Sequence, residues 1–324
     1  MNTAKQAKLY REDGKYLLAL RCAQLGSDPE SKAEESLALC WLGRIQQAEK
    51  CASEAWNMCR TNTAPDIRVR VLLSLINSQL SMGKYDESET LIEQVQRELP
   101  APSDAELRCR ILLAKSALAA QKGDFHPSIQ YAKEGAIAIR RGRERVLAEA
   151  MHALADACHR SGHLEQAVVH WRAALALRKK NLRTQHPEIA TNIDGMALTC
   201  RRLNMPELAI ALHTEALGIY RQTFDETHPA RAACHHGLSQ CYSRLEKPHL
   251  AIFHIEKALL FSENRLGKDH IDTWVTRFEL GRMEIASGKT ERGFTRMEHA
   301  YARAKQILGA KHPTVLSMDK WRKD

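Results

Sequence analysis

Aromatic residues, proline and glycine are all scarce in this sequence of 324 residues. Phe, Trp and Tyr together make up 6% of it, and there are only 16 glycines and 10 prolines. A loop-rich β protein or a collagen-like chain needs many more prolines and glycines, so the composition argues against both classes. The sequence has no apolar run of about 20 residues, so no transmembrane helix is expected. Residues 1–6 have no apolar stretch behind them, so a signal peptide is not expected.

The residues that are abundant favour helices. Ala, Leu, Arg, Glu and Lys dominate the composition, which is typical of an all-α protein. A hydrophobic content of 44% with 27% charged residues excludes a wholly disordered chain. The net charge of +9 favours partners with acidic surfaces and says nothing about the fold.

The nine cysteines are odd in number and contain no Cys-x-x-Cys pair. Eight of them fall in stretches with helical periodicity. This pattern predicts buried, reduced thiols in a cytoplasmic protein rather than a disulfide framework.

A 42-residue repeat runs through the C-terminal half of the sequence. A loop histidine recurs at this interval, and we expect it to cap the helix that follows it rather than to bind a metal. These histidines are His186, His228, His270 and His312. Within each repeat a short break separates two helical stretches, and its central residue marks the register of the repeat. The same kind of break recurs upstream at shorter intervals. The predicted turn positions are Gly14, Gly43, Gly83, Gly123, Gly162, Asn204, Glu246 and Gly288.

Small residues follow each turn at fixed distances. Five residues after it stand Ala, Ser or Gly, as in Ala167 and Gly293, and twelve residues after it stand Ala, Gly or Val, as in Ala174 and Val95. Small side chains let two helices of a hairpin approach closely. A single hairpin cannot bury its apolar face alone, so the pattern predicts stacked hairpins with one continuous core.

The turns Gly14-Lys15-Tyr16, Gly83-Lys84-Tyr85 and Gly123-Asp124-Phe125 resemble the glycine-x-aromatic turn of tetratricopeptide repeats. The segment from His186 to Ala190, with Ala209 and Ala216, resembles the 42-residue repeats of kinesin light chains. The resemblance implies a right-handed superhelical solenoid that binds a protein or peptide on its concave face. An asparagine usual in the light-chain repeats is replaced here by Gly195, Gly237 and Glu279, so the grip on a peptide backbone should differ.

The sequence predicts eight hairpins and one capping helix in a single solenoid over residues 1–324. The predicted hairpins are 2–26, 30–60, 66–98, 104–141, 144–182, 187–223, 229–266 and 271–308. Residues 1–100 carry divergent repeats, 101–312 carry regular ones, and 313–324 form the cap with Trp321 packed inward. The sharpest break is Pro100 to Ser103, where Ser103 is a candidate N-cap.

Metal and cofactor sites have little support in the sequence. His159 and His163 have the spacing of a shared metal site on a helix, but His163 lies beyond the turn glycine. The adjacent His235 and His236 should point about 100° apart. No nucleotide-binding or hydrolase motif occurs, so we expect a non-enzymatic protein with no cofactor or metal.

The concave surface is the best candidate for a binding site. Residues at 13, 10, 9, 6, 3 and 2 positions before each turn should line it. From the third hairpin onward the polar residues expected there are Arg70, Asn77, Arg110, Glu149, His152, Asp156, His159, Arg160, Asp194, Arg201, Arg202, His236, Gln240, Arg244, Glu279 and Arg282, and the apolar residues expected beside them are Leu73, Leu113, Ala117 and Phe278.

Arg160, Arg202 and Arg244 occupy one frame position in three consecutive hairpins. Guanidinium groups bind carboxylates in a bidentate fashion, so a row of them would suit an acidic peptide. The alternative is a solvated surface balanced by Asp156, Asp194 and Glu279. Nucleic acid is disfavoured because acidic residues interleave with the basic ones.

The expected function is therefore an interaction scaffold or adaptor that binds a partner protein or acidic peptide in its groove. Two alternatives stay open. One is a regulatory receptor whose superhelix curvature changes when it binds a peptide. The other is an enzyme or accessory subunit that uses the groove for a small substrate.

Overall fold

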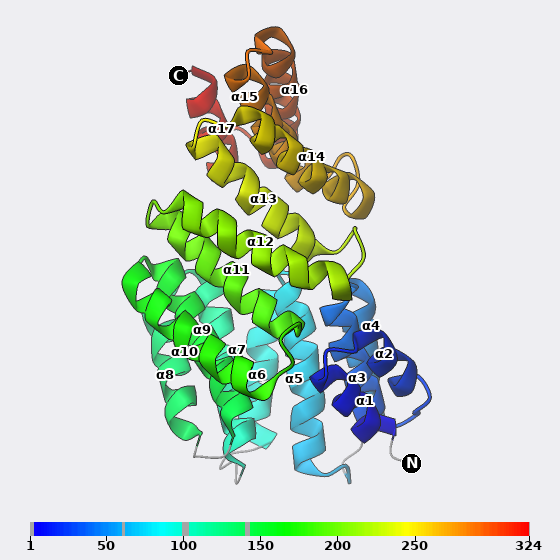
Figure 1. Ribbon diagram of the computed structural model, residues 1–324. Helices are drawn as coiled ribbons and strands as arrows, with labels where there is room; N and C mark the ends of the chain where they lie inside the picture. The colour runs from blue at the N-terminus through cyan, green and yellow to red at the C-terminus, as the bar shows by residue number, and fades with distance from the viewer. Residues whose placement is uncertain (1–2, 60–61, 99–103, 140–142, 324) are drawn as a thin grey trace. The chain divides into compact units, whose positions relative to one another are not determined.

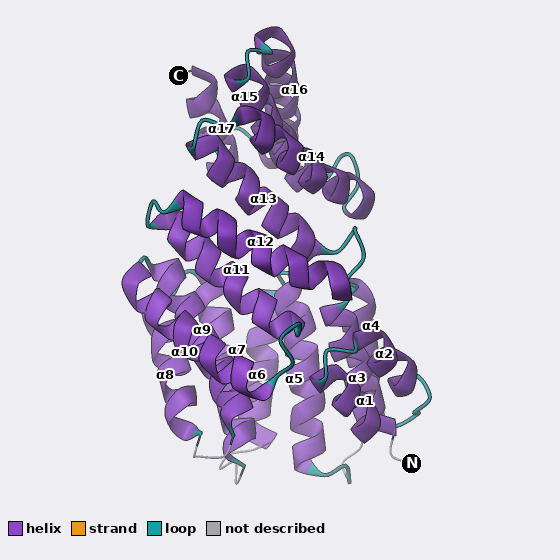
Figure 2. Cartoon of the chain, viewed as in Figure 1, coloured by secondary structure: helices purple, strands orange, loops and turns teal. Residues whose placement is uncertain are grey.

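The computed structural model describes residues 3–59, 62–98, 104–139 and 143–323. Within these ranges the chain forms seventeen α-helices and no strand (Figures 1 and 2). No helix in these ranges is both long enough and apolar enough to cross a membrane. The expected all-α fold built from helical hairpins is confirmed.

Sixteen helices pair into eight hairpins, and each hairpin matches a predicted one. The first four are α1 (Thr3–Glu12) with α2 (Tyr16–Ala23), α3 (Pro29–Trp41) with α4 (Ile45–Met58), α5 (Pro65–Ser81) with α6 (Tyr85–Glu98), and α7 (Ala105–Lys122) with α8 (Phe125–Ala138). The next four are α9 (Glu144–Ser161) with α10 (Leu164–Asn181), α11 (Pro187–Arg202) with α12 (Pro206–Thr223), α13 (Pro229–Arg244) with α14 (Pro248–Arg265), and α15 (Ile271–Ala286) with α16 (Thr290–Leu308). The capping helix is α17 (Pro313–Lys323).

The eight predicted turn positions share one backbone conformation. Each has a positive φ, including the two that are not glycine, Asn204 at 59° and Glu246 at 55°. A left-handed residue ends the first helix of a hairpin and lets the chain reverse into the second. The turn register read from the sequence is therefore confirmed at every hairpin.

The small residues of the repeat frame lie where helices cross. Ala48, Ala167, Ala209 and Ala251 stand five residues after a turn, and each is fully buried. The frame fails once. Gly26 was expected inside the second helix of the first hairpin, but α2 ends at Ala23, so Gly26 lies in the loop before α3.

The recurring loop histidines cap helices as expected. The Nδ1 atoms of His186, His228, His270 and His312 each accept a hydrogen bond of 3.2 Å from the backbone N–H two residues further on. This contact satisfies one of the free N–H groups at a helix start. An imidazole that accepts at Nδ1 is neutral, which is the form that a structural cap requires.

The capping helix and the loop at residue 100 differ from expectation. Trp321 is 52% exposed, so its predicted inward packing is wrong. Val315 and Met318 provide the buried side chains of α17 instead. The segment from Pro100 to Ser103 lies outside the described residues, and the N-cap of α7 is Asp104, whose side chain accepts from the backbone N–H of Glu106.

The chain divides into two compact units, residues 1–195 and residues 196–324. The division falls inside α11 and not at residue 100. The continuous solenoid over residues 1–324 stays a prediction. All nine cysteines are free thiols, eight lie in helices, and Cys59 directly follows α4. The expected burial holds for five of them, whereas Cys22, Cys40, Cys51 and Cys59 are only partly buried.

Candidate functional site

In the first unit, the turn between α1 and α2 touches the start of α9 and the loop before α11. Arg183 Nε lies 3.1 Å from Asp13 Oδ1. His186 Nε2 donates to the carbonyl oxygen of Glu12 at 3.2 Å. Arg145 donates to the same carbonyl at 3.2 Å and to Glu188 Oε1 at 3.1 Å. We call these contacts the clasp. They join residues up to 174 positions apart, so the first unit closes on itself.

The closed unit contains a cavity of about 560 Å³. Its wall is built by the first helices of successive hairpins, α1, α3, α5, α7 and α9, together with residues of α10 and α11. The apolar lining comprises Ala4, Ala33, Leu37, Trp41, Leu73, Leu107, Leu113, Ala114 and Ala117. The polar lining comprises Lys5, Lys8, Arg11, Glu30, Glu34, Arg70, Ser74, Asn77, Glu106, Arg110, Glu149, Arg178 and Glu188.

Ion pairs hold the arginines of the cavity wall. Arg11 Nε lies 2.7 Å from Glu34 Oε2, and Arg110 lies 3.1 Å from Glu106 and 2.9 Å from Glu149. The carboxylate of Glu149 raises the pKa of Arg110. Burial opposes the charge of Arg11, but attraction to Glu34 and a hydrogen bond to it outweigh burial and raise its pKa. These guanidinium groups are fixed in place before any ligand arrives.

The most buried charge of the wall is Arg178, which is 6% exposed. Its Nη1 donates to Glu188 O, to Asn192 Oδ1 and to His152 Nδ1 at 2.9 to 3.1 Å. Burial opposes ionisation of Glu188, but attraction to Arg178 and Arg145 outweighs it, so its pKa lies below the ordinary value. Burial, with Arg178 beside it, lowers the pKa of His152 to about 3.

The cavity brings together seven of the residues that the sequence assigned to the groove: Arg70, Leu73, Asn77, Arg110, Leu113, Ala117 and Glu149. His152 packs edge-on against Trp171, at 4.7 Å between ring centroids, and is not among the lining residues. Arg160 lies outside that lining too, and its Nε donates to Asp156 on the same helix at 2.8 Å. The predicted lining of the first unit is thus split between the cavity wall and the remainder of the unit.

In the second unit, three predicted residues form one network. His236 Nε2 lies 2.5 Å from Glu279 Oε2, and Gln240 Nε2 lies 3.5 Å from Glu279 Oε1. Burial opposes the charge of Glu279, but the contact with His236 outweighs it and lowers the pKa of the carboxyl. The guanidinium of Arg282 stacks on Trp321, 3.5 Å from the ring centroid.

The other predicted arginines of the second unit sit at the end of α11 and of α13. Arg244 Nη1 donates to the carbonyl of Arg201 and to Asn204 Oδ1, at 3.1 and 3.2 Å. Burial lowers the pKa of Arg201. Arg202 is exposed. Asp194, the remaining predicted residue, is half-buried on the part of α11 that belongs to the first unit.

The two glycines that replace the expected asparagine leave room for rings. A Cβ atom on Gly195 would lie 2.6 Å from ring carbons of Trp171. A Cβ on Gly237 would lie 2.4 Å from Nε2 of His213. Trp171 and His213 are 42 residues apart, so they occupy the same repeat position in the second helices of consecutive hairpins. In each hairpin this ring fills the space that an asparagine side chain would use. This packing explains the departure from the light-chain pattern.

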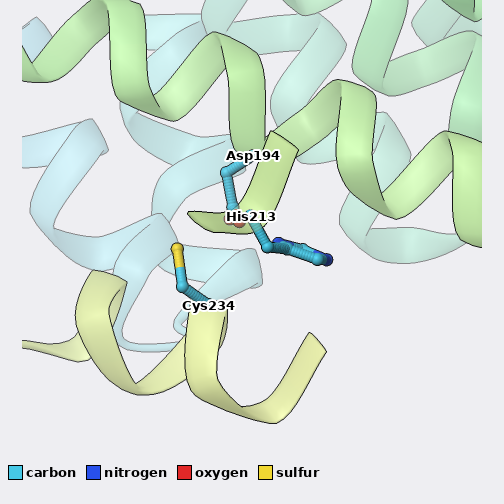
Figure 3. A group of neighbouring side chains, drawn as sticks. All are labelled: Asp194, His213 and Cys234. Atoms are coloured by element: carbon cyan, nitrogen blue, oxygen red, sulfur yellow. The ribbon is translucent and has the colours of Figure 1, made fainter. Parts of the chain in front are cut away.

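The histidine and cysteine groups give no metal site that we assign. His163 Nδ1 lies 2.8 Å from Ser161 Oγ. As expected, His235 and His236 face different neighbours, since His235 contacts His254 at 2.9 Å between the Nδ1 atoms. Figure 3 shows Asp194 of α11 with His213 of α12 and Cys234 of α13. Asp194 belongs to the first unit and the other two to the second, and no site is assigned across that division.

The sequence reasoning missed the contribution of the first two hairpins to the cavity. The lining positions were read only from the third hairpin onward. Applied to Gly14 and Gly43 within the described residues, the same offsets give Glu12 and Cys40, which are not lining residues, and nine residues that line the cavity: Ala4, Lys5, Lys8, Arg11, Glu30, Ala33, Glu34, Leu37 and Trp41. Arg178 and Glu188 were missed for another reason: the offsets do not reach them.

The tetratricopeptide repeat family matches residues 146–222 and 189–264. No curated protein matches the sequence. Among solved structures, the nearly identical TPR-like repeats of a kinesin light chain from Podosopora anserina are 20% identical, with a TM-score of 0.55 over 64% of this chain and 99% of theirs.

Two further solved structures share more of the chain. A Rap protein complexed with competence and sporulation factor is 14% identical, with a TM-score of 0.64 over 89% of this chain and 84% of its own. The apo form of the quorum sensor NprR from B. thuringiensis is 12% identical, with a TM-score of 0.63 over 90% and 80%. Likenesses at these identities show the fold. With the left-handed turns, the 42-residue register and the family match over residues 146–264, they show a tetratricopeptide-repeat fold, and the C-terminal half resembles kinesin-light-chain repeats.

Proposed function

We propose that the protein is a non-enzymatic adaptor that binds a peptide, or a segment of a partner protein, in the cavity of the first unit. The observation that carries this proposal is a cavity of about 560 Å³ with both apolar and charged walls. Ligand sites are typically concave, about 300–1,000 Å³ in volume, and mostly apolar with a few fixed polar groups. The Rap protein, whose structure holds competence and sporulation factor, and the quorum sensor NprR share this fold and support the same proposal.

The test is to fill the cavity without disturbing the core. Asn77 is exposed and lines the cavity, so Asn77→Trp places a large ring there at small cost to folding. Ser81→Trp is the matched control, since Ser81 is exposed on the same helix and is not a lining residue. Peptides selected from a displayed library on the unmodified protein should bind Ser81→Trp normally and lose at least tenfold in affinity for Asn77→Trp. Equal affinity for both variants would exclude the cavity as the site.

The second unit supports a finer version of the proposal, in which the partner is acidic. Burial lowers the pKa of both Arg201 and Arg282, so a carboxylate that reached either cation would stabilise its charged form. Acidic peptides should therefore bind more tightly than neutral ones of the same length, and the double variant Arg201→Gln with Arg282→Gln should remove that preference. Unchanged discrimination in the double variant would leave the acidic character of the partner without support.

A second candidate function is a peptide-sensing receptor, which the clasp favours. The clasp closes the first unit through polar contacts between residues far apart in the sequence, and such contacts can exchange for contacts with a ligand. A receptor of this kind should change its radius of gyration in solution scattering when a selected peptide binds. An adaptor of fixed shape should show the same radius with and without the peptide.

A further inference from the structure

The second compact unit has an open groove on its last hairpin, which α15 and α16 form (Figure 1). The two helices cross closely, because Gly281 and Gly293 face each other. A Cβ atom on Gly281 would lie 2.8 Å from the carbonyl oxygen of Gly293, so small residues are needed for this approach. Glu284, one turn further along α15, therefore lies against the first turns of α16 and is only 2% exposed.

The buried carboxylate of Glu284 holds two arginines that stand one turn apart on α16, Arg292 and Arg296. Arg292 Nε lies 2.8 Å from Glu284 Oε1. Arg296 donates from Nε to Glu284 Oε2 at 2.8 Å and from Nη2 to Oε1 at 3.3 Å. Among the described residues, the two Nη groups of Arg292 and the Nη1 group of Arg296 have no hydrogen-bond partner. Because each Nη group carries two N–H donors, two fixed guanidinium groups keep unused donors.

The same groove, of about 750 Å³, is lined by both arginines and contains a further unused donor. Trp274 lines it and is 5% exposed, and the Nε1 atom of Trp274 has no hydrogen-bond partner in the described part of the chain. The imidazole of His299 lines the groove too and packs edge-on against the indole, at 5.0 Å between ring centroids. The third arginine of the lining, Arg277, is already occupied, since its Nη2 donates to Glu263 at 2.6 Å. An unpaired buried N–H costs free energy, so a ligand rich in acceptors suits this groove.

These donors suit a phosphate monoester better than a carboxylate. A phosphate monoester carries a charge of about −1.5 to −2 at pH 7 and three strong acceptor oxygens. It can bind two guanidinium groups at once, whereas one guanidinium fork satisfies both oxygens of a carboxylate. Glu291, an exposed carboxylate of the lining, opposes additional negative charge. The groove should therefore accept a single phosphate and reject a chain of them, such as a nucleic-acid backbone.

Independently of the proposed function, we infer that the groove between α15 and α16 binds a phosphate monoester, whose oxygens accept from the free Nη groups of Arg292 and Arg296. A phosphorylated side chain of a partner protein has this chemistry, and so does a small phosphorylated molecule. The site is separate from the expected concave surface. On α15 that surface was assigned Phe278, Glu279 and Arg282, and none of these three lines the groove.

Calorimetric titration of four probes tests the inference. Three are capped pentapeptides of alanine with phosphoserine, glutamate or serine at the centre, and the fourth is phenyl phosphate. The phosphoserine peptide should bind at least tenfold more tightly than the other two peptides. Arg292→Gln should weaken its binding at least tenfold, and it should fold normally because the side chain of Arg292 is 61% exposed and Glu284 keeps Arg296. Lys305→Gln is the matched control: it removes the same charge from an exposed position of α16 outside the lining and should change the affinity less than twofold.

Each remaining outcome decides part of the inference. Equal binding of the phosphoserine and glutamate peptides would show a site for any anion, and the phosphate assignment would be wrong. Equal losses in Arg292→Gln and Lys305→Gln would show general charge attraction and overturn the site. If no probe binds at millimolar concentration to the unmodified protein, the inferred ligand class is wrong. Phenyl phosphate that binds as tightly as the phosphoserine peptide would identify small phosphates as ligands, and binding at least tenfold weaker would identify a phosphorylated segment of a partner. The cavity of the first unit stays the subject of its own test, since Asn77→Trp should leave phosphate binding unchanged.

Discussion

The two compact units use the same repeat frame for different structures. In residues 1–195 the lining positions of five hairpins converge on one cavity, and the clasp ties the first turn to the loop before α11. In residues 196–324 the equivalent positions of α13 and α15 contact each other, as His236 does with Glu279. The frame therefore sets which side chains face inward, and closure of the unit decides whether they surround a ligand-sized space.

The difference also shows in how charge is buried. Arg178 and Glu188 lie inside the closed unit with nearly full burial and several partners each. Such pairs contribute little net stability but penalise any arrangement that separates them. We therefore expect these charges to hold the closed first unit in one arrangement. Substitutions that remove them should distinguish the two units most clearly.

The largest expected effect is on Arg178. Arg178→Met keeps an unbranched apolar stem but leaves Glu188 buried with one cation fewer, and it removes the donor to His152. We expect a loss of about 3–5 kcal/mol in the free energy of unfolding of the first unit. Hydrogen exchange resolved along the sequence should show faster exchange in residues 143–195. Arg172→Met, at an exposed position of the same helix, should change it by less than about 0.5 kcal/mol.

Gly195 and Gly237, which stand where the light-chain repeats have an asparagine, allow the same substitution to be tested in both units. Gly195→Ala pushes a methyl group into Trp171, and Gly237→Ala pushes one into His213. Overpacking of this kind costs up to about 3 kcal/mol, so each variant should destabilise its own unit in chemical denaturation. Gly218→Ala is the control, because nothing lies within 4 Å of its Cβ position, and it should stabilise α12 by about 0.5–1 kcal/mol. Destabilisation by all three would mean that helix geometry, and not the rings, decides the effect.

Much of the fold could be predicted from the sequence because the repeats are regular. The turn positions, the hairpin bounds and the histidine caps depend on local backbone chemistry, which the 42-residue register exposes. The same register, applied to Gly14 and Gly43, would have added Lys5, Arg11, Glu34 and Trp41 to the predicted lining of the cavity. Those residues were missed through incomplete use of a valid rule.

Other features had no signal in a single sequence. The clasp joins Asp13 to Arg183, and no local pattern relates residues 170 positions apart. The expected inward packing of Trp321 is wrong because Val315 and Met318 already form the buried face of α17. The indole ring is exposed and stacks with the guanidinium of Arg282. The ion pairs in the cavity likewise depend on how successive hairpins are oriented relative to one another. A local sequence pattern does not specify that orientation.

Acid should weaken the first unit through His152. Its pKa is about 3 in the folded protein and about 6.5 when unfolded, because burial and Arg178 disfavour the imidazolium. The unfolded chain therefore binds the proton first, and stability falls as pH drops below about 6.5. Between pH 7 and pH 5 the loss attributable to this group is about 2 kcal/mol. His152→Gln keeps an acceptor for Arg178 and should flatten this part of the pH profile, whereas His126→Gln, at an exposed position of α8, should not.

The smallest expected effect concerns the outer ion pair of the clasp. Arg183 and Asp13 are 60% and 39% exposed, so their pair should be worth less than about 1 kcal/mol and should weaken in 0.5 M salt. Arg183→Asp should speed hydrogen exchange in the α1–α2 turn by a few fold, and the double variant Asp13→Arg with Arg183→Asp should restore it. Restoration would show that charge attraction contributes to closing the first unit. If the double variant exchanges as fast as the single one, the bonds from His186 and Arg145 to the carbonyl of Glu12 hold the clasp, and closure depends on backbone geometry that no exchange of charges can repair.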